Sequence, residues 1–351
     1  MMRIIPYKSW VFLAAALLAP ASAAWAQTTA HAVNIFDSLV RDYNLVAFGN
    51  ASFSGHSIEG SLAVRGNLTL SSTPVASHHG AGADPTLFVS GKLTLQNDSH
   101  LQRGYASVNS SKNSHLTVSG NQVTSSSGKL ILNADTSNPK TNPGPANWNW
   151  ATIQSQAISI SQTLKNAAQT GTIAVNQGNQ TLTFTSSSSQ PGVVVFQLDA
   201  SKLGQSSYNG INNVNNVAFN LAANQTAVVN VINADGRTLF SGYNFNDNGN
   251  VGGHLLWNFN GTGSVTIGNN GDFFGSILAP EMTLNNRNNR LDGQLIVKDI
   301  NYSGAQLHFE EFAPIGVLVP EPATYAWWTV ALCAAGWWWQ RRRARSADTH
   351  T

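Results

Sequence analysis

Only two short stretches bring together side chains that could do chemistry. His78 and His79 are adjacent and could bind a metal ion. Metal sites need further ligands in a fixed shell, so we interpret this pair as solvated polar residues. His308 lies just before Glu310 and Glu311, but glycoside hydrolysis needs two carboxylates held a set distance apart across a sugar. We interpret these acidic residues as a polar edge of the domain.

The common catalytic motifs are absent from the sequence. It contains no Gly-Lys-Ser/Thr phosphate loop, no His-Glu-x-x-His, no Gly-x-Ser-x-Gly and no calcium loop with aspartates at alternate positions. The only cysteine, Cys333, falls in an apolar run near the C-terminus, which excludes a thiol nucleophile or a zinc–thiolate site elsewhere. We therefore predict a protein that is not an enzyme, with no catalytic residue, metal site or cofactor.

The C-terminal residues form three parts in order. Pro320, Glu321 and Pro322 make a short turn, and an uncharged apolar run follows over residues 323–339. A helix of about 17–25 residues spans a bilayer, and this run reaches the lower limit. Basic residues stay in the cytoplasm, so we expect everything before Pro320 to lie outside. The basic residues that close the tail are Arg341, Arg342, Arg343 and Arg345.

This order of parts resembles the PEP-CTERM sorting signal, in which Pro320-Glu321-Pro322 would be the recognition motif. The resemblance implies an exosortase partner in the inner membrane and release to the outer surface or the polysaccharide matrix. We predict a linker with the motif over residues 315–322, a transmembrane helix over 323–340 and a basic cytoplasmic tail over 341–351. The alternative is an ordinary membrane anchor with a chance Pro-Glu-Pro.

The N-terminal residues also indicate export. Arg3 and Lys8 precede a short apolar run, residues 11–19, and Ala24 and Ala26 form an A-x-A cleavage site. We predict a Sec signal peptide over residues 1–26, since the apolar run is too short for a transmembrane helix. The expected location is the inner membrane of a Gram-negative bacterium for the precursor, and the cell surface or matrix for the mature protein.

The positive charge of the chain comes from its two ends. The formal net charge is +2, from 19 basic and 17 acidic residues. Six of the basic and two of the acidic residues lie in the predicted signal peptide and tail, which leaves 13 against 15. Nucleic-acid binding needs a clustered basic face, so we predict no nucleic-acid partner.

A short phrase repeats through the exported part: glycine, any residue, Leu or Ile, any residue, then a small or branched apolar residue. The apolar residues alternate with period two, so they share one face of a strand, and the glycine provides a corner. These units predict a mainly β fold, specifically a β-solenoid of stacked coils, with a β-sandwich as the alternative. The phrases begin at Gly60, Gly66, Gly91, Gly128, Gly275 and Gly293.

One segment has helical periodicity instead. Across residues 147–169 the apolar residues recur at spacings of three and four, which predicts one long helix packed alongside the β body. A briefer pattern in residues 27–42 predicts one or two helical turns. The apolar stripe of the long helix is Trp150, Ile153, Ala157, Ile160, Leu164 and Ala168.

Three stretches together resemble the choice-of-anchor A domain, an exported module found with several kinds of surface anchor. They are residues 43–64, 150–169 and 256–298. The C-terminal part is also similar to bacterial ice-binding and ice-binding-like adhesive domains, which are β-solenoids with a helix alongside. The resemblance implies one domain over residues 27–314, with an adhesive role and no catalytic residues.

The sequence thus predicts a non-enzymatic, exported surface protein that binds extracellular polysaccharide or another surface ligand. A regular face of Thr, Ser and Asn can make many weak hydrogen bonds, each worth about 0.5–1.5 kcal/mol. One alternative is an ice-binding protein on the same fold, which requires a flat, regularly spaced Thr face. Another is a polysaccharide-degrading β-solenoid enzyme, which requires a groove with clustered basic residues and carboxylates.

Overall fold

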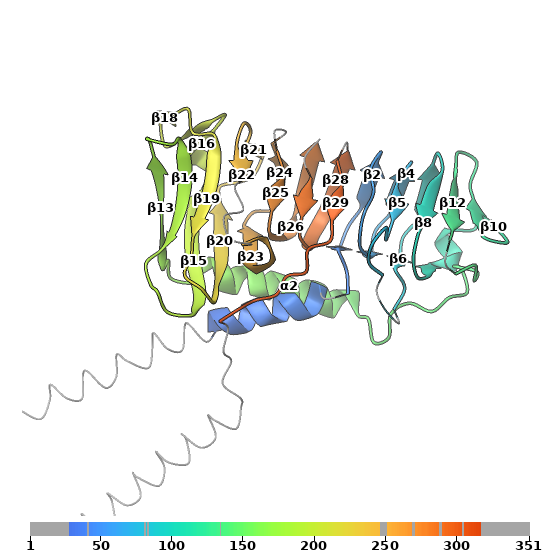
Figure 1. Ribbon diagram of the computed structural model, residues 1–351. Coiled ribbons are helices and arrows are strands. Elements are labelled where there is room, and N and C mark those ends of the chain that lie inside the picture. The colour runs from blue at the N-terminus through green and yellow to red at the C-terminus, as the bar shows by residue number, and fades with distance from the viewer. Residues whose placement is uncertain are drawn as a thin grey trace, which may run out of the picture. The chain divides into compact units, whose positions relative to one another are not determined.

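The computed structural model describes residues 28–316, except residues 41, 81, 83, 134, 246–250, 269–270, 288–289 and 304. The chain divides into two compact units, Met1–Val317 and Leu318–Thr351, and all described residues belong to the first. This unit is mainly β with few helices, as the alternating phrases predict (Figure 1).

A first row of parallel strands runs the length of the unit (Figure 1). Strands from opposite ends of the chain meet in its middle, where Leu45 lies opposite Leu295 and Ala47 opposite Val297. From Leu45 the chain adds strands outward to one end of the row. It then crosses to the opposite end and adds strands back toward Leu295. The order is β15 (Gly192–Asp199), β20 (Gln225–Ile232), β23 (Leu255–Phe259), β26 (Ser276–Arg287), β28 (Leu295–Ser303), β1 (Leu45–Ala47), β3 (Leu62–Val64), β6 (Leu87–Val89) and β9 (Ala106–Val108).

A second row of parallel strands lies beside the first. β26 and β28 are long enough to contribute to both rows, and their register shifts between Ala279 and Thr283. The second row consists of β21 (Arg237–Leu239), β24 (Ser264–Ile267), the later halves of β26 and β28, β2 (Ala51–Ser54), β4 (Leu68–Ser71) and β7 (Leu93–Gln96).

A third row is made of shorter strands, and Ile58 links its two parts through bridges to Leu307 and Val75. One part is β25 (Phe273–Phe274), β27 (Leu291–Asp292) and β29 (Leu307–His308); the other is β5 (Pro74–Val75), β8 (Ser99–Leu101), β12 (Lys129–Leu132), β11 (Gln122–Thr124) and β10 (Thr117–Ser119). The far end of the stack carries β13 (Gly171–Asn176), β14 (Thr181–Ser186), β19 (Asn216–Asn220) and β22 (Asn244–Phe245), with the small β16 (Leu203–Gly204), β17 (Ser207–Tyr208) and β18 (Ile211–Asn212). Short 3-10 turns are η2 (Ser110–Lys112), η3 (Ala200–Lys202) and η4 (Gly252–His254).

The repeated glycines lie where successive segments of the chain come closest. A Cβ on Gly66 would lie 2.2 Å from the carbonyl oxygen of Gly49, and one on Gly91 would lie 2.0 Å from that of Gly66. No side chain fits there, so each of these phrases needs its glycine at the corner. The alternating Leu and Val residues that follow point inward and fill one continuous core between the three rows.

Helices cover the outer face of the first row. The predicted long helix is α2 (Trp150–Lys165), which begins where the Asn149 side chain accepts a hydrogen bond from the Thr152 amide. The expectation of a single long helix is wrong, because residues 28–40 form a second one beside it (Figure 1). Val33, Phe36 and Val40 of this N-terminal helix are fully buried. Their spacing of three and four residues gives it a full apolar stripe against the sheet, which sustains more than two turns.

Candidate functional site

Short polar side chains form one continuous file along the second row. Register places one such residue of each strand directly opposite the next, across seven strands. Each of these side chains is exposed or partly exposed. We call this file the polar ladder: Thr238, Thr266, Asn285, Asn301, Ser52, Thr69 and Thr94.

The spacing of the polar ladder follows from the sheet. Neighbouring strands lie about 4.8 Å apart, so the hydroxyl and amide groups repeat at about that distance. A second file lies two residues further along the same strands, about 6.8 Å away. It contains Ser303, Ser54, Ser71 and Gln96, which are also opposite one another. The two files together make a regular two-dimensional array of hydrogen-bonding groups, and the register continues the second file from Ser303 to Arg287 of β26.

The core holds the polar ladder in place. In β4 the pattern Leu-Thr-Leu-Ser buries Leu68 and Leu70 completely and leaves Thr69 facing outward. The same alternation operates in β7, where Leu93 and Leu95 are buried. One lateral hydrogen bond is formed within the ladder, from Asn301 Nδ2 to Asn285 Oδ1 at 2.9 Å. The array is therefore preorganised by strand geometry.

A line of side-chain hydrogen bonds braces the corner next to the ladder. The backbone amide of Asn50 donates to Asp299 Oδ1 at 2.6 Å, and the backbone amide of Asn67 donates to Asn50 Oδ1 at 2.9 Å. The Lys92 amide in turn donates to Asn67 Oδ1 at 2.9 Å. The sequence signal for this bracing is a Gly-Asn pair before a strand: Gly49-Asn50 precedes β2, and Gly66-Asn67 precedes β4.

The structure brings His308 together with two carboxylates, but they are not those of its sequence neighbours. Its Nδ1 lies 3.4 Å from Asp292 Oδ1, and its Nε2 lies 3.6 Å from Glu59 Oε1. Burial raises the pKa of the Asp292 carboxyl, although the Arg290 guanidinium 2.9 Å away opposes this shift. No local sequence pattern indicates this cluster, because its members come from chain segments that are far apart in sequence.

The two histidines considered for metal binding point to different partners. His78 Nδ1 lies 3.1 Å from Glu59 Oε1, and the His79 ring packs on Phe309 with ring centroids 4.5 Å apart. Over the described ranges, no group of three or more His, Cys, Asp and Glu side chains is arranged to hold a metal ion. Glu310 lies against Gly252, at the 3-10 turn η4, and Glu311 is exposed.

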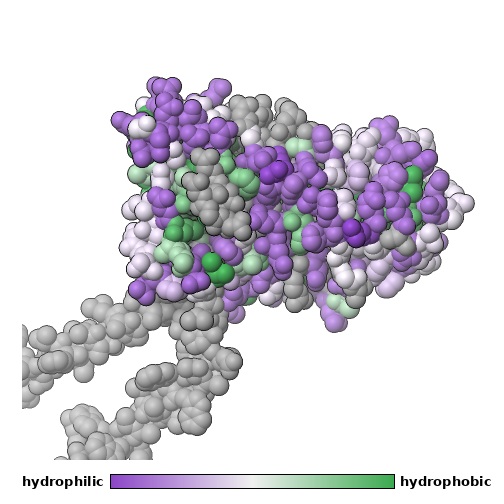
Figure 2. Space-filling model, in the orientation of Figure 1, coloured by the Kyte–Doolittle hydropathy of each residue, from purple (hydrophilic) through white to green (hydrophobic). Residues whose placement is uncertain are grey.

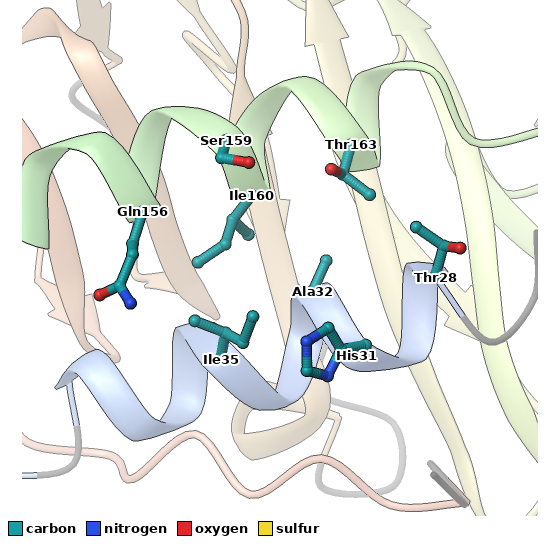
Figure 3. Close-up of a pocket in the computed structure, with 8 residues that line it drawn as sticks. All are labelled: Thr28, His31, Ala32, Ile35, Gln156, Ser159, Ile160 and Thr163. Atoms are coloured by element: carbon teal, nitrogen blue, oxygen red, sulfur yellow. The ribbon is translucent and has the colours of Figure 1, made fainter. Parts of the chain in front are cut away.

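A shallow groove of about 240 Å³ lies between the two helices (Figure 3). Ala32 and Ile35 of the N-terminal helix face Ile160 of α2 across it, and the rim is formed by Thr, Ser, Gln and His side chains. The lining includes one histidine, His31, and no Asp, Glu, Lys or Arg side chain. The face of the molecule in Figure 2 is mostly hydrophilic, with hydrophobic residues in small separate patches.

The sequence-predicted targeting residues lie outside the described ranges. They are the sorting motif Pro320, Glu321 and Pro322, the arginines Arg341, Arg342, Arg343 and Arg345, and the cleavage-site residues Ala24 and Ala26. These assignments remain predictions. Within the part of the chain that the structure describes, no helix is long and apolar enough to span a membrane.

Residues 36–309 match the family described as "Putative Ice-binding-like adhesive domain". Among curated proteins, none matches the chain. A glycosylated ice-binding protein from Arctic yeast is 13% identical with a TM-score of 0.33, over 78% of this chain and 93% of that one. The ice-binding protein of the Antarctic ascomycete Antarctomyces psychrotrophicus is 13% identical with a TM-score of 0.29, over 78% of this chain and 96% of that one. The DUF3494 domain of Shewanella frigidimarina ice-binding protein_1 is 12% identical with a TM-score of 0.28, over 75% of this chain and 93% of that one. Because these scores are low, the family assignment rests on the sequence match.

Proposed function

The chain belongs to the ice-binding-like adhesive domain family, and we propose that it is a non-enzymatic surface protein that binds extracellular polysaccharide through the polar ladder. The observation that carries this proposal is the continuous register of seven short polar side chains across the second row. A polysaccharide presents hydroxyl groups in a regular series, which such a file can meet at several points at once.

The energetics favour an extended ligand. One hydrogen bond contributes about 0.5–1.5 kcal/mol net, which is too little for useful affinity by itself. Several aligned bonds from a preorganised face bind without a large ordering cost in the protein. In this proposal the three rows close into a β-solenoid, which keeps the ladder flat. Support comes from the parallel strands of the first two rows and from the core that all three rows share.

Ice is the second candidate ligand, because the same array also suits ordered water. The ladder contains four Thr residues on regularly spaced strands, and each is exposed or partly exposed: Thr238, Thr266, Thr69 and Thr94. The amides Asn285 and Asn301 interrupt the threonines and bond to each other. This interruption favours a hydroxyl-rich polymer, which accepts mixed partners, over a lattice that needs identical ones.

The proposal also includes the route to the surface. The protein would cross the inner membrane by the Sec pathway, and an exosortase would process it near Pro320-Glu321-Pro322 and release it from the membrane. The support is the order of motif, apolar run and arginine cluster in the sequence. Fractionation of host cells that express either the natural chain or the Pro320→Ala variant checks this route. Retention of the Pro320→Ala chain in the inner membrane is expected, and its release at the natural level would contradict the route.

The binding proposal is tested by replacing one ladder residue with a bulky one. Thr69→Tyr should block close approach of an extended chain and lower retention on immobilised host exopolysaccharide at least tenfold. Thr117→Tyr is the matched control, because Thr117 is an exposed threonine on β10, away from the ladder. Unchanged binding by Thr69→Tyr would refute the proposal. Inhibition of ice recrystallisation by the natural chain, abolished by Thr69→Tyr, would instead support ice as the ligand.

A further inference from the structure

The sheet edge is covered by a loop at one end of the strand stack and is left open at the other. At the β9 end, the loop over residues 138–142 covers the edge: the Val108 amide donates to the Pro139 carbonyl at 2.9 Å, and Asn142 Nδ2 donates to the Ala106 carbonyl at 2.8 Å. The Lys140 ammonium also bonds to the Leu116 carbonyl, next to the short strand β10. Covering loops, short strands and lysines are the means by which proteins keep sheet edges from pairing with other chains.

The opposite end lacks this protection on β13. This strand pairs with β14 along all six of its residues, and no other described strand pairs with it. Thr172, Ala174 and Asn176 are exposed, while Ile173 and Val175 pack on the core. β13 contains neither proline nor a charged residue, and the whole stretch of residues 166–198 carries no Asp, Glu, Lys or Arg. In Figure 1, β13 forms the outer edge of the molecule at this end.

The neighbouring edge of β15 is already occupied, which makes β13 the accessible one. The Thr170 amide donates to the Val195 carbonyl at 2.9 Å, and the Val195 amide donates to Thr170 Oγ1 at 2.9 Å. On β13 the Gly171 carbonyl accepts a hydrogen bond from Gln169 Nε2 at 2.7 Å, and no described strand other than β14 pairs with β13. A row of main-chain donors and acceptors of this length is best matched by another β-strand.

We propose that β13 pairs antiparallel with β13 of a second copy of this chain, around a two-fold axis at Ala174. A two-fold axis brings the same edge of both copies together and closes the assembly as a dimer. Ala174 would lie opposite itself and Thr172 opposite Asn176, so exposed side chains meet exposed side chains on one face. The uncharged stretch adds no like-charge repulsion between the copies. The dimer carries two polar ladders, which raises avidity for a repetitive ligand.

The test is the oligomeric state of the full chain in mild detergent, measured by analytical ultracentrifugation across a wide concentration range. The natural chain should be dimeric, and Ala174→Lys should raise the dimer dissociation constant at least tenfold by adding a charge at the axis. Thr117→Lys is the matched control, because it adds the same charge to the exposed edge strand at the other end. The control should remain dimeric.

A cross-linking variant tests the register without weakening the strand. Ala174→Cys in a Cys333→Ser background should give a covalent dimer with a short bis-maleimide, whereas Thr117→Cys in that background should not. A natural chain that is monomeric at every concentration would overturn the proposal. A dimer that survives Ala174→Lys, or an open-ended series of larger oligomers, would also overturn it. The proposal does not depend on the ligand, so it can fail while polysaccharide binding holds.

Discussion

Asparagine side chains at the corners between strands contribute to stability one residue at a time. Asn67 Oδ1 accepts a hydrogen bond from the backbone amide of Lys92 at the next corner. The backbone amide of Asn67 donates to Asn50 Oδ1. Asn67→Ala leaves the Lys92 amide without this acceptor, so we expect the free energy of unfolding to fall by about 1–2 kcal/mol. Urea unfolding measures this loss. Asn220→Ala, at an exposed position on β19, should change stability by less than about 0.5 kcal/mol. Equal losses in both variants would contradict the bracing role.

The acid stability of the protein should depend on Asp199. Hydrogen bonds from Asn233 Nδ2 at 2.9 Å and from the Ser201 hydroxyl at 2.7 Å hold the pKa of this carboxyl below its ordinary value. A lowered pKa in the folded state means that the contribution is present above the unfolded value of about 3.9 and is lost as the pH falls through the folded value. Unfolding followed from neutral to strongly acidic pH should therefore show a shallower acid limb in Asp199→Asn than in the natural chain. An identical acid limb in the two proteins would rule out this contribution.

At the scale of elements, α2 is fixed to the sheet by a buried polar network. Asn258 Nδ2 donates to the Ser161 carbonyl at 2.9 Å and to Asn230 Oδ1 at 2.7 Å. Asn230 Nδ2 donates to the Leu164 carbonyl at 2.7 Å, and both asparagines are fully buried. The helix therefore docks in one register, because a shift along the sheet would leave these groups buried without partners.

Replacing Asn258 tests this docking. Asn258→Leu removes three buried hydrogen bonds, two that Asn258 Nδ2 donates and one that Asn258 Oδ1 accepts from Ser161 Oγ at 2.7 Å. We therefore expect a loss of about 2–4 kcal/mol in the free energy of unfolding. Hydrogen exchange should also become faster in α2 than in β4, which is remote from the network. Ser155→Ala, on the exposed face of the same helix, serves as the control. Stability and exchange close to those of the natural chain would show that this network does not hold the helix.

The individual elements could be predicted from local patterns, but their partners could not. Period two marked β4 and β7, and spacings of three and four marked α2, because these patterns reflect which side chains face the core. The pairing of β1 with β28 joins residues about 250 positions apart, and nothing local to Leu45 or Leu295 indicates it. The N-terminal helix is longer than its local pattern predicts for a related reason: it packs on residues distant in sequence, such as Phe312, whose ring centroid lies 5.1 Å from that of Phe36.

The same limit applies to the candidate site. Composition predicted a face of Thr, Ser and Asn, and the Leu-Thr-Leu phrases indicated that these residues point outward. The continuous file depends on register between strands, which places Ser52 between Asn301 and Thr69 although Asn301 is far from both in sequence. The His308 cluster with Asp292 and Glu59 depends on register in the third row in the same way.

At the scale of the whole molecule, the first row supports the helices, the second presents the polar ladder, and the third carries the charged cluster. This division places the ladder on a different row from the helices and from the charged cluster. It also means that affinity should increase with the number of hydroxyl groups that the ladder offers, and no single residue should dominate.

A stepwise removal of ladder hydroxyls tests polysaccharide binding through the ladder most directly. Three substitutions are combined in the full chain, in the order Thr69→Val, Thr94→Val and Ser52→Ala. Each one removes a single hydroxyl with little change in shape. The dissociation constant for host exopolysaccharide should rise at each step by about two- to twelvefold, the equivalent of about 0.5–1.5 kcal/mol per bond. A dissociation constant that stays unchanged through the triple variant would show that the ligand binds elsewhere on the protein.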